Sequence, residues 1–199
     1  MLFGCLALFG AVTFGCSSTD QTQDGPGPCV DLNQLPTTPT ISFKNDLMPI
    51  FGLSCIASSC HDTSAHKADL ILGDPSACGK PTCFDGSAKW KYTFPPGNPS
   101  DALVLQVAQN LVKASTTIPS VMRVTPNQPE NSFLMDKLLG LETSKPYVPQ
   151  CKNQDPSKSP NQCGGTMPLD SPSLCDPVAG DPTKVQAIAM WIQQGAQNN

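Results

Sequence analysis

A pair of cysteines with a histidine directly after it constrains this chain more than any other feature. Cys55 and Cys60 form the pair, and His61 follows. A c-type haem is attached by two cysteine thioethers, with the adjacent histidine on its iron, and the usual spacing is Cys-x-x-Cys-His. Four residues separate the cysteines here, so the run is a longer variant of that attachment sequence.

The spacing also bears on local structure. On an ideal helix, residues five apart point in directions that differ by roughly 140°. Two sulfurs that reach one porphyrin edge from positions 55 and 60 therefore need a loop between them, which the small residues 57–59 permit. The alternative is a local Cys55–Cys60 disulfide with His61 as an ordinary surface residue, and the spacing leaves both interpretations open.

The N-terminal residues are typical of an exported protein. Residues 1–15 are almost wholly apolar and too short to span a bilayer, as in a secretory signal peptide. The following Gly15-Cys16 step resembles a lipoprotein cleavage site, which predicts a lipidated Cys16. A plain secretory leader, with Cys16 discarded or in a disulfide, is the alternative. We expect a lipid anchor and flexible tether over residues 16–41 and a domain over 42–199, in the cell envelope on the periplasmic or outer-surface side.

Composition excludes some classes of function. The formal net charge is −4 and only 12 residues are Lys or Arg, which argues against a nucleic-acid partner. Twenty-one prolines, fifteen glycines and 6% aromatic residues are typical of a loop-rich, cross-linked fold. No Ser-His-acid set, phosphate loop or pair of carboxylates stands out, and two histidines are too few for a multi-histidine metal site.

Cysteine counting predicts disulfides in the oxidising compartment. Without Cys5 in the leader and Cys16, eight cysteines remain: Cys29, Cys55, Cys60, Cys78, Cys83, Cys151, Cys163 and Cys175. A haem on Cys55 and Cys60 would leave three pairs, and four pairs would form without haem. Candidate local pairs are Cys78–Cys83 and Cys151–Cys163, which would leave Cys29 with Cys175, although sequence alone cannot derive the connectivity.

Apolar periodicity predicts short helices. The first begins after Ser42 as a cap and is kinked or restarted at Pro49. Two similar segments, 98–111 and 128–141, each place a proline at a helix start before an apolar stripe. The last helix is capped by Asp181, has Pro182 at its first position and ends at Gly195. The predicted fold is mainly α, with a long cross-linked loop over residues 142–180.

A second iron ligand is expected in that loop. The stretch Gly164-Gly165-Thr166-Met167-Pro168 places Met167 just before the final helix, and a thioether ligand raises the potential of a haem. Met48, Met135 and Met190 fall in predicted helices and are expected in the core, and Met122 is a weaker candidate. The alternative for Met167 is a loop methionine that packs on the core.

The order of these pieces resembles a known family. Six short segments follow one another as in the small c-type cytochrome domains of planctomycetes. They are a helix with Leu47-Met48-Pro49-Ile50, the Cys–Cys-His run, residues 68–72, Pro96-Gly97-Asn98-Pro99, Met167-Pro168 and the 191–196 run. Those domains are similar to class I cytochromes c. The resemblance covers about residues 42–197. It implies a cytochrome c-like helical fold, covalent haem c on Cys55 and Cys60, axial ligands His61 and Met167, and packing of Trp191 against the helix with Phe43 and Phe51.

These observations predict a monohaem c-type cytochrome lipoprotein that carries single electrons, meets a redox partner transiently and is not itself an enzyme. The alternative is a haem-free, disulfide-stapled helical lipoprotein that acts as a binding or structural module. A haem peroxidase is a third, weaker interpretation, since it would require an open sixth position on the iron.

Overall fold

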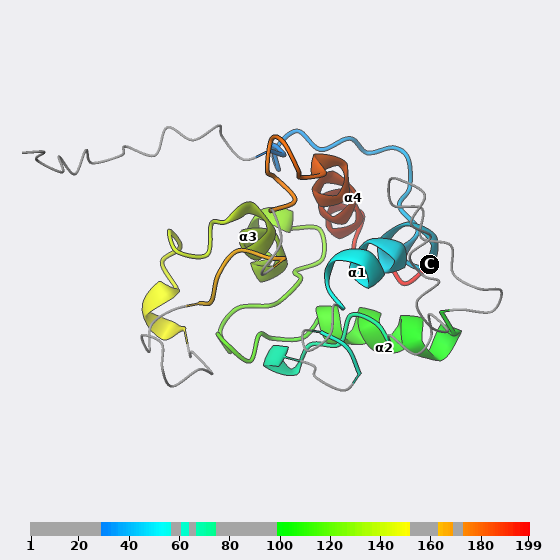
Figure 1. The fold of residues 1–199 in the computed structure, drawn as a ribbon, viewed down its shortest axis with the longest axis horizontal. Coiled ribbons are helices and arrows are strands. Elements are labelled where there is room, and N and C mark those ends of the chain that lie inside the picture. Colours follow the sequence, from blue (N-terminus) through cyan, green and yellow to red (C-terminus); the bar gives the residue numbers. More distant parts are fainter. Residues whose placement is uncertain (1–28, 57–60, 64–66, 75–98, 152–162, 169–172) are drawn as a thin grey trace, which may run out of the picture.

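The part of the chain that the structure describes is helical. The computed structural model describes residues 29–56, 61–63, 67–74, 99–151, 163–168 and 173–199 (Figure 1). Within these ranges the α-helices are α1 (Met48–Ser54), α2 (Asp101–Leu111), α3 (Phe133–Leu139) and α4 (Pro182–Gln193), with a π-helical turn η1 (Phe43–Leu47) before α1. Short 3-10 turns are η2 (Lys67–Asp69), η5 (Pro129–Asn131) and η6 (Val148–Gln150). The described ranges hold no β-strand, so the prediction of a mainly α fold is confirmed for them.

The first helical segment begins and changes as predicted. The Ser42 hydroxyl caps η1 by accepting a hydrogen bond from the backbone N–H of Asn45 at 3.2 Å. Pro49 then lies in the first turn of α1, where a regular helix leaves N–H groups without partners inside the helix, so its missing N–H removes no hydrogen bond of α1. The chain therefore passes from a π-helical turn into a regular helix at this proline.

The two repeated segments form helices that start later than predicted. Pro99 precedes the Ser100 cap of α2, and the Ser100 hydroxyl accepts from the N–H of Leu103 at 3.3 Å. Pro129 begins the turn η5, whereas α3 starts at Phe133. Both prolines thus stiffen the approach to a helix and do not occupy its first position.

The last helix differs from the prediction only at its cap. Pro182 occupies the first turn of α4, and Gly195 follows the helix with φ of 93°. Asp181 makes no capping hydrogen bond to the backbone. Its carboxylate accepts from the Thr183 hydroxyl and lies 3.7 Å from Lys184 Nζ, so neighbouring side chains take the role expected of backbone N–H groups.

The core forms where the first and last helical segments meet. Figure 1 shows η1 and α1 lying between α4 and α2. The rings of Phe43 and Trp191 are 5.1 Å apart and those of Phe43 and Phe51 are 6.2 Å apart, and all three side chains are fully buried. The packing of Trp191 against Phe43 that the resemblance implied is present.

The packed part of the chain begins before residue 42. Val30, Leu35 and Ile41 are buried in the main core, and Cys29 is bonded to Cys175 with their Cα atoms 5.4 Å apart. Residues 29–41 are therefore held on the domain by apolar burial and a cross-link, unlike the flexible tether expected over this range. Among the described residues no helix is long and apolar enough to cross a membrane.

Candidate functional site

The cysteine–histidine run leaves the first helix and turns back on itself. Helix α1 ends at Ser54, and the N–H of Cys55 donates to the carbonyl of Phe51 at 2.8 Å. The Cys55 carbonyl then accepts from the N–H of His61 at 3.3 Å. The structure therefore brings the backbones of Cys55 and His61 together. Cys60 itself lies outside the described residues, as do Cys16, Cys78 and Cys83.

The His61 ring has a defined hydrogen-bond partner. Its Nδ1 lies 3.0 Å from the carbonyl oxygen of Lys67. A carbonyl only accepts, so Nδ1 carries the proton and Nε2 keeps an unprotonated lone pair. Burial lowers the pKa of His61, backbone hydrogen bonds with Leu70 and Lys67 raise it in part, and the positive charges of Arg123 and Lys137 lower it to a smaller extent. The neutral imidazole is the form that binds metals.

The segment after the histidine is tied back onto the run. The N–H of Leu72 donates to the His61 carbonyl at 2.8 Å, and Asp62 and Gly73 form a parallel bridge. A Cβ at Gly73 would lie 3.0 Å from Ile56 Cγ2, so a larger residue here would require the Ile56 side chain to move by a few tenths of an ångström. Residues 67–74 therefore wrap around the histidine.

Met167 is held in place by α3. Its backbone N–H donates to the Lys137 carbonyl at 2.8 Å, and its side chain is partly buried against the main core. Lys137 Nζ also donates to the carbonyls of Cys163, at 3.2 Å, and Gly165. The Thr166 hydroxyl donates to Glu142 Oε1 at 3.3 Å. Residues 163–167 are thus fastened to α3 and to the turn that follows it.

Lys137 contacts one of the two predicted ligands directly, since its carbonyl accepts from the N–H of Met167. Its charge also lowers the pKa of His61, as the smallest of the causes acting on that ring. Burial lowers the pKa of Lys137, and Glu142 raises it in part.

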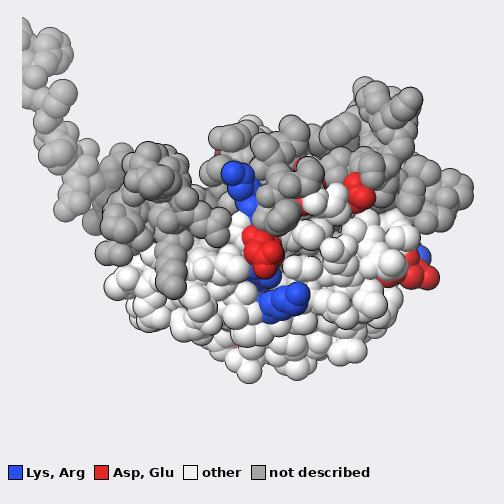
Figure 2. Space-filling model, turned by 90° about the horizontal axis from the view of Figure 1, so that it is seen from below, with Lys and Arg blue, Asp and Glu red and all other residues white. Residues whose placement is uncertain are grey.

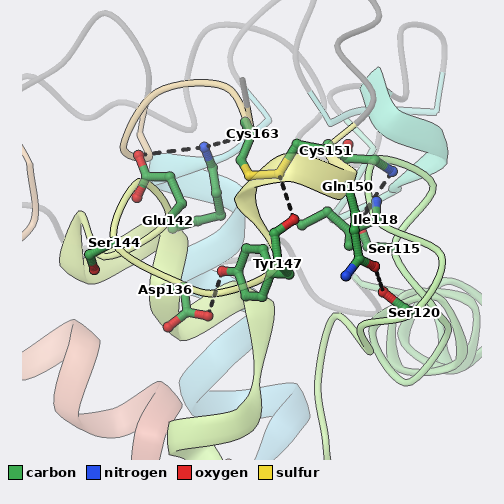
Figure 3. The surroundings of a disulfide bond; sticks show 12 residues. Ser115, Ile118, Ser120, Asp136, Glu142, Ser144, Tyr147, Gln150, Cys151 and Cys163 are labelled. Atoms are coloured by element: carbon green, nitrogen blue, oxygen red, sulfur yellow. Dashed lines mark hydrogen bonds and ion pairs between the residues drawn. A yellow bond between two sulfur atoms is a disulfide. The ribbon is translucent and has the colours of Figure 1, made fainter. Parts of the chain in front are cut away.

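The loop with Met167 is cross-linked to a second, smaller core. Cys151 and Cys163 form a disulfide with Cα atoms 5.0 Å apart, as predicted (Figure 3). Both cysteines are buried with Ile118 and Phe133. The disulfide therefore anchors the start of the 163–168 segment on the α3 side of the molecule.

A buried hydroxyl–carboxylate pair lies beside this disulfide. Tyr147 packs edge-on against Phe133, with ring centroids 5.8 Å apart, and its hydroxyl donates to Asp136 Oδ2 at 2.7 Å (Figure 3). Burial and the Asp136 carboxylate raise the pKa of Tyr147 far above its usual value. Lys145 Nζ lies 2.7 Å from the other oxygen of Asp136.

Sequence patterns did not single out the buried charges around the site. Arg123, Asp136, Lys137 and Glu142 are each at most 7% exposed. For Asp136 and Lys137 the sequence of α3, Phe-Leu-Met-Asp-Lys-Leu-Leu, carries a signal, because all its other residues are apolar. A helix that is apolar on all sides is buried, and the charges within it are then buried too. Arg123 lies in a loop and has no such signal.

The described residues contain no group of three or more His, Cys, Asp or Glu side chains that could hold an ion on its own. One histidine and one methionine nevertheless suffice for a haem, since the porphyrin supplies the other four iron ligands. No protein family, curated protein or solved structure matches this chain.

Proposed function

We propose that this protein is a monohaem c-type cytochrome of the cell envelope that carries single electrons. Haem c would be bound covalently by Cys55 and Cys60, with His61 and Met167 as axial ligands. The helical fold would be cytochrome c-like, with the first and last helical segments in contact at Phe43 and Trp191.

One observation carries this proposal. The hydrogen bond from His61 Nδ1 to the Lys67 carbonyl leaves Nε2 unprotonated in the neutral ring. Histidines that bind metals almost always donate their other ring N–H to a carbonyl or carboxylate, which fixes ring orientation and raises ligand basicity. An ordinary surface histidine would not need this arrangement directly after a cysteine pair.

The hold on Met167 supports the second ligand. Its N–H is bonded to Lys137, and the flanking residues Cys163, Gly165 and Thr166 are bonded to Lys137 or Glu142. Because these hydrogen bonds already order the loop, little backbone conformational entropy would be lost when the Met167 thioether binds. A bound haem would supply reversible one-electron chemistry, and a methionine ligand would raise its reduction potential.

The protein's own residues would set the surroundings of such a group. Leu72, whose N–H donates to the His61 carbonyl, is buried in the main core, and the partly buried Leu70 packs against that core. Among the described residues on the face that Figure 2 shows, seen from below in Figure 1, the charged side chains lie among uncharged ones. This accords with a small, transient contact with a redox partner, as is typical of electron transfer. A lipid anchor at Cys16 would hold the protein at a membrane surface.

The packing of the core favours a second candidate. Phe43, Leu47, Phe51, Leu111, Ile188 and Trp191 are fully buried against other side chains of this chain. Together with two disulfides, this core is of the kind that could stand without a prosthetic group. The second candidate is therefore a haem-free, disulfide-stapled lipoprotein that serves as a binding or structural module.

Substitution of the two histidines distinguishes these candidates. The full chain is produced in a host with cytochrome maturation genes, as wild type, His61→Gln and His66→Gln. A cytochrome predicts a reduced-minus-oxidised haem spectrum in wild type and in His66→Gln, and its loss or a changed spin state in His61→Gln. A spectrum unaffected by His61→Gln would overturn the assignment of that ligand. Colourless, folded wild-type protein would leave the stapled module.

A further inference from the structure

Arg123 is a buried cation whose two terminal nitrogens both donate to backbone carbonyls. It is 5% exposed. Its Nη1 donates to the carbonyl of Asn110 at 2.9 Å, and its Nη2 donates to the carbonyls of Ala68 at 2.8 Å and Asp69 at 3.0 Å. The planar fork of a guanidinium suits such a fixed set of acceptors better than an ammonium group does. The buried arginine thus ties the turn η2 to the end of α2.

The turn that it holds has an unfavourable backbone. Ala68 and Asp69 both lie in the left-handed region, with φ of 56° and 53°. Residues with a Cβ avoid this region, and they persist there only where the surroundings fix them. Arg123 supplies two of the bonds that do so. Thr116 supplies a third, because its hydroxyl donates to the Ala68 carbonyl at 2.7 Å.

The same turn presents the acceptor for the His61 ring. Lys67 directly precedes the two left-handed residues, and its carbonyl accepts from His61 Nδ1 at 3.0 Å. It also accepts from the N–H of Leu70 at 3.3 Å, across the turn. If the turn relaxed to an ordinary conformation, this carbonyl would turn away from the ring.

We propose that Arg123 is a positioning residue for His61, and that it acts with Thr116 through the Ala68–Asp69 turn. By holding the turn it aims the Lys67 carbonyl at Nδ1, and thereby fixes which nitrogen of His61 is left to bind a ligand. The consequence for iron binding rests on the proposed function. The effect of Arg123 on the tautomer of the His61 ring does not rest on it, and this effect is measurable without haem.

The first experiment uses haem-free full-length protein from a host without cytochrome maturation genes. All variants carry His66→Gln, so that His61 is the one histidine left, and the ring nitrogens are observed by ¹⁵N NMR at a pH where the ring is neutral. In the parent protein the Nδ1–H form should exceed about nine-tenths, since the hydrogen bond sets the tautomer. In Arg123→Gln it should fall below about half, as Nδ1 loses its acceptor.

Three further variants separate positioning from charge and from folding. Arg123→Lys keeps the charge but not the fork, and it should restore the Nδ1–H form only in part. Thr116→Val removes the independent bond to Ala68 and should shift the tautomer in the same direction, even if Arg123→Gln does not fold. Lys113→Gln removes one exposed positive charge from the same region and should leave the tautomer unchanged.

The second experiment uses protein matured with haem. Loss of the Nδ1 hydrogen bond makes imidazole a less basic ligand, so Arg123→Gln should shift the reduction potential upward, while Lys113→Gln should not. Folded Arg123 and Thr116 variants with the parental tautomer would overturn the inference, as would a parent protein without the Nδ1–H form. A wild type that takes up no haem would end the proposed function instead, and the tautomer measurement would still decide the role of Arg123.

Discussion

Lys137 and Glu142 form an ion pair that is almost entirely removed from water. Lys137 Nζ lies 3.8 Å from Glu142 Oε1, and the two side chains are 8% and 3% exposed. Glu142 Oε2 has no hydrogen-bond partner. The lysine therefore offsets the desolvation of the carboxylate while it holds the carbonyls of the Met167 loop.

Removing one member of this pair should cost more than removing both. Lys137→Met leaves Glu142 charged, buried and uncompensated, which costs about 3–5 kcal/mol of unfolding free energy. Lys137→Met combined with Glu142→Leu leaves no buried charge and should regain most of that loss. Urea unfolding of the two variants and of wild type measures the difference. A double variant less stable than Lys137→Met would contradict this account of the pair.

The two described disulfides should contribute unequally to the free energy of unfolding. Cys151–Cys163 closes a separation of 12 residues, whereas Cys29–Cys175 closes one of 146. Loss of the short link should cost about 3 kcal/mol and loss of the long one about 5 kcal/mol, because a longer loop restricts the unfolded chain more. Paired Cys→Ser variants compared by urea unfolding test this order, and a costlier short link would refute it.

Tyr147 should make stability depend on alkaline pH. Its pKa is raised in the fold by burial and by Asp136, so the folded state keeps the phenolic proton above pH 10.0, the ordinary pKa at which the unfolded chain releases it. The unfolded state then binds fewer protons, and the free energy of unfolding falls as pH rises above about 10. Tyr147→Phe removes the hydrogen bond to the charged Asp136, and it should therefore lower the free energy of unfolding by about 1.5–3 kcal/mol at neutral pH.

The comparison across pH isolates this residue from other titrating groups. The stability deficit of Tyr147→Phe relative to wild type should shrink between pH 9 and pH 11, since only wild type carries the raised pKa. A deficit that stays constant over that range would mean that Tyr147 releases its proton equally in both states.

The contact of Phe43 with Trp191 should be a main source of stability. Phe43→Ala removes a fully buried ring that touches Trp191 and Phe51, at a cost of about 3–5 kcal/mol. Leu105→Ala is the matched control on the surface of α2, where the side chain is 47% exposed, and it should change stability by less than about 0.5 kcal/mol. Equal effects of the two substitutions would place the core elsewhere.

Local sequence signals predicted the local features of this fold. The Ser42 cap, the restart at Pro49 and the start of α4 at Pro182 each depend on one residue and its neighbours. The Cys151–Cys163 disulfide, with a separation of 12, was likewise a local candidate. These features need no knowledge of distant contacts, whereas Cys29–Cys175 joins residues 146 apart and was only what the other candidate pairs would leave.

The groups that hold the candidate site could not be predicted in this way. Carbonyls from the turn η2 and from the end of α2 surround the buried Arg123, a tertiary arrangement that no periodic pattern in the sequence indicates. The left-handed turn at Ala68 and Asp69 carries no glycine to mark it. The burial of Val30 and Leu35 likewise depends on a surface formed by residues far along the chain.

Covalent haem is the central claim, and the intact mass of the protein tests it most directly. Wild type, Cys55→Ala, Cys60→Ala and Cys78→Ala are produced with cytochrome maturation genes, and each is analysed by mass spectrometry and by a haem stain on a denaturing gel. The account predicts a mass gain of one haem and a stained band for wild type and Cys78→Ala, with both weakened or lost in the other two. Folded wild-type protein with no added mass would contradict it.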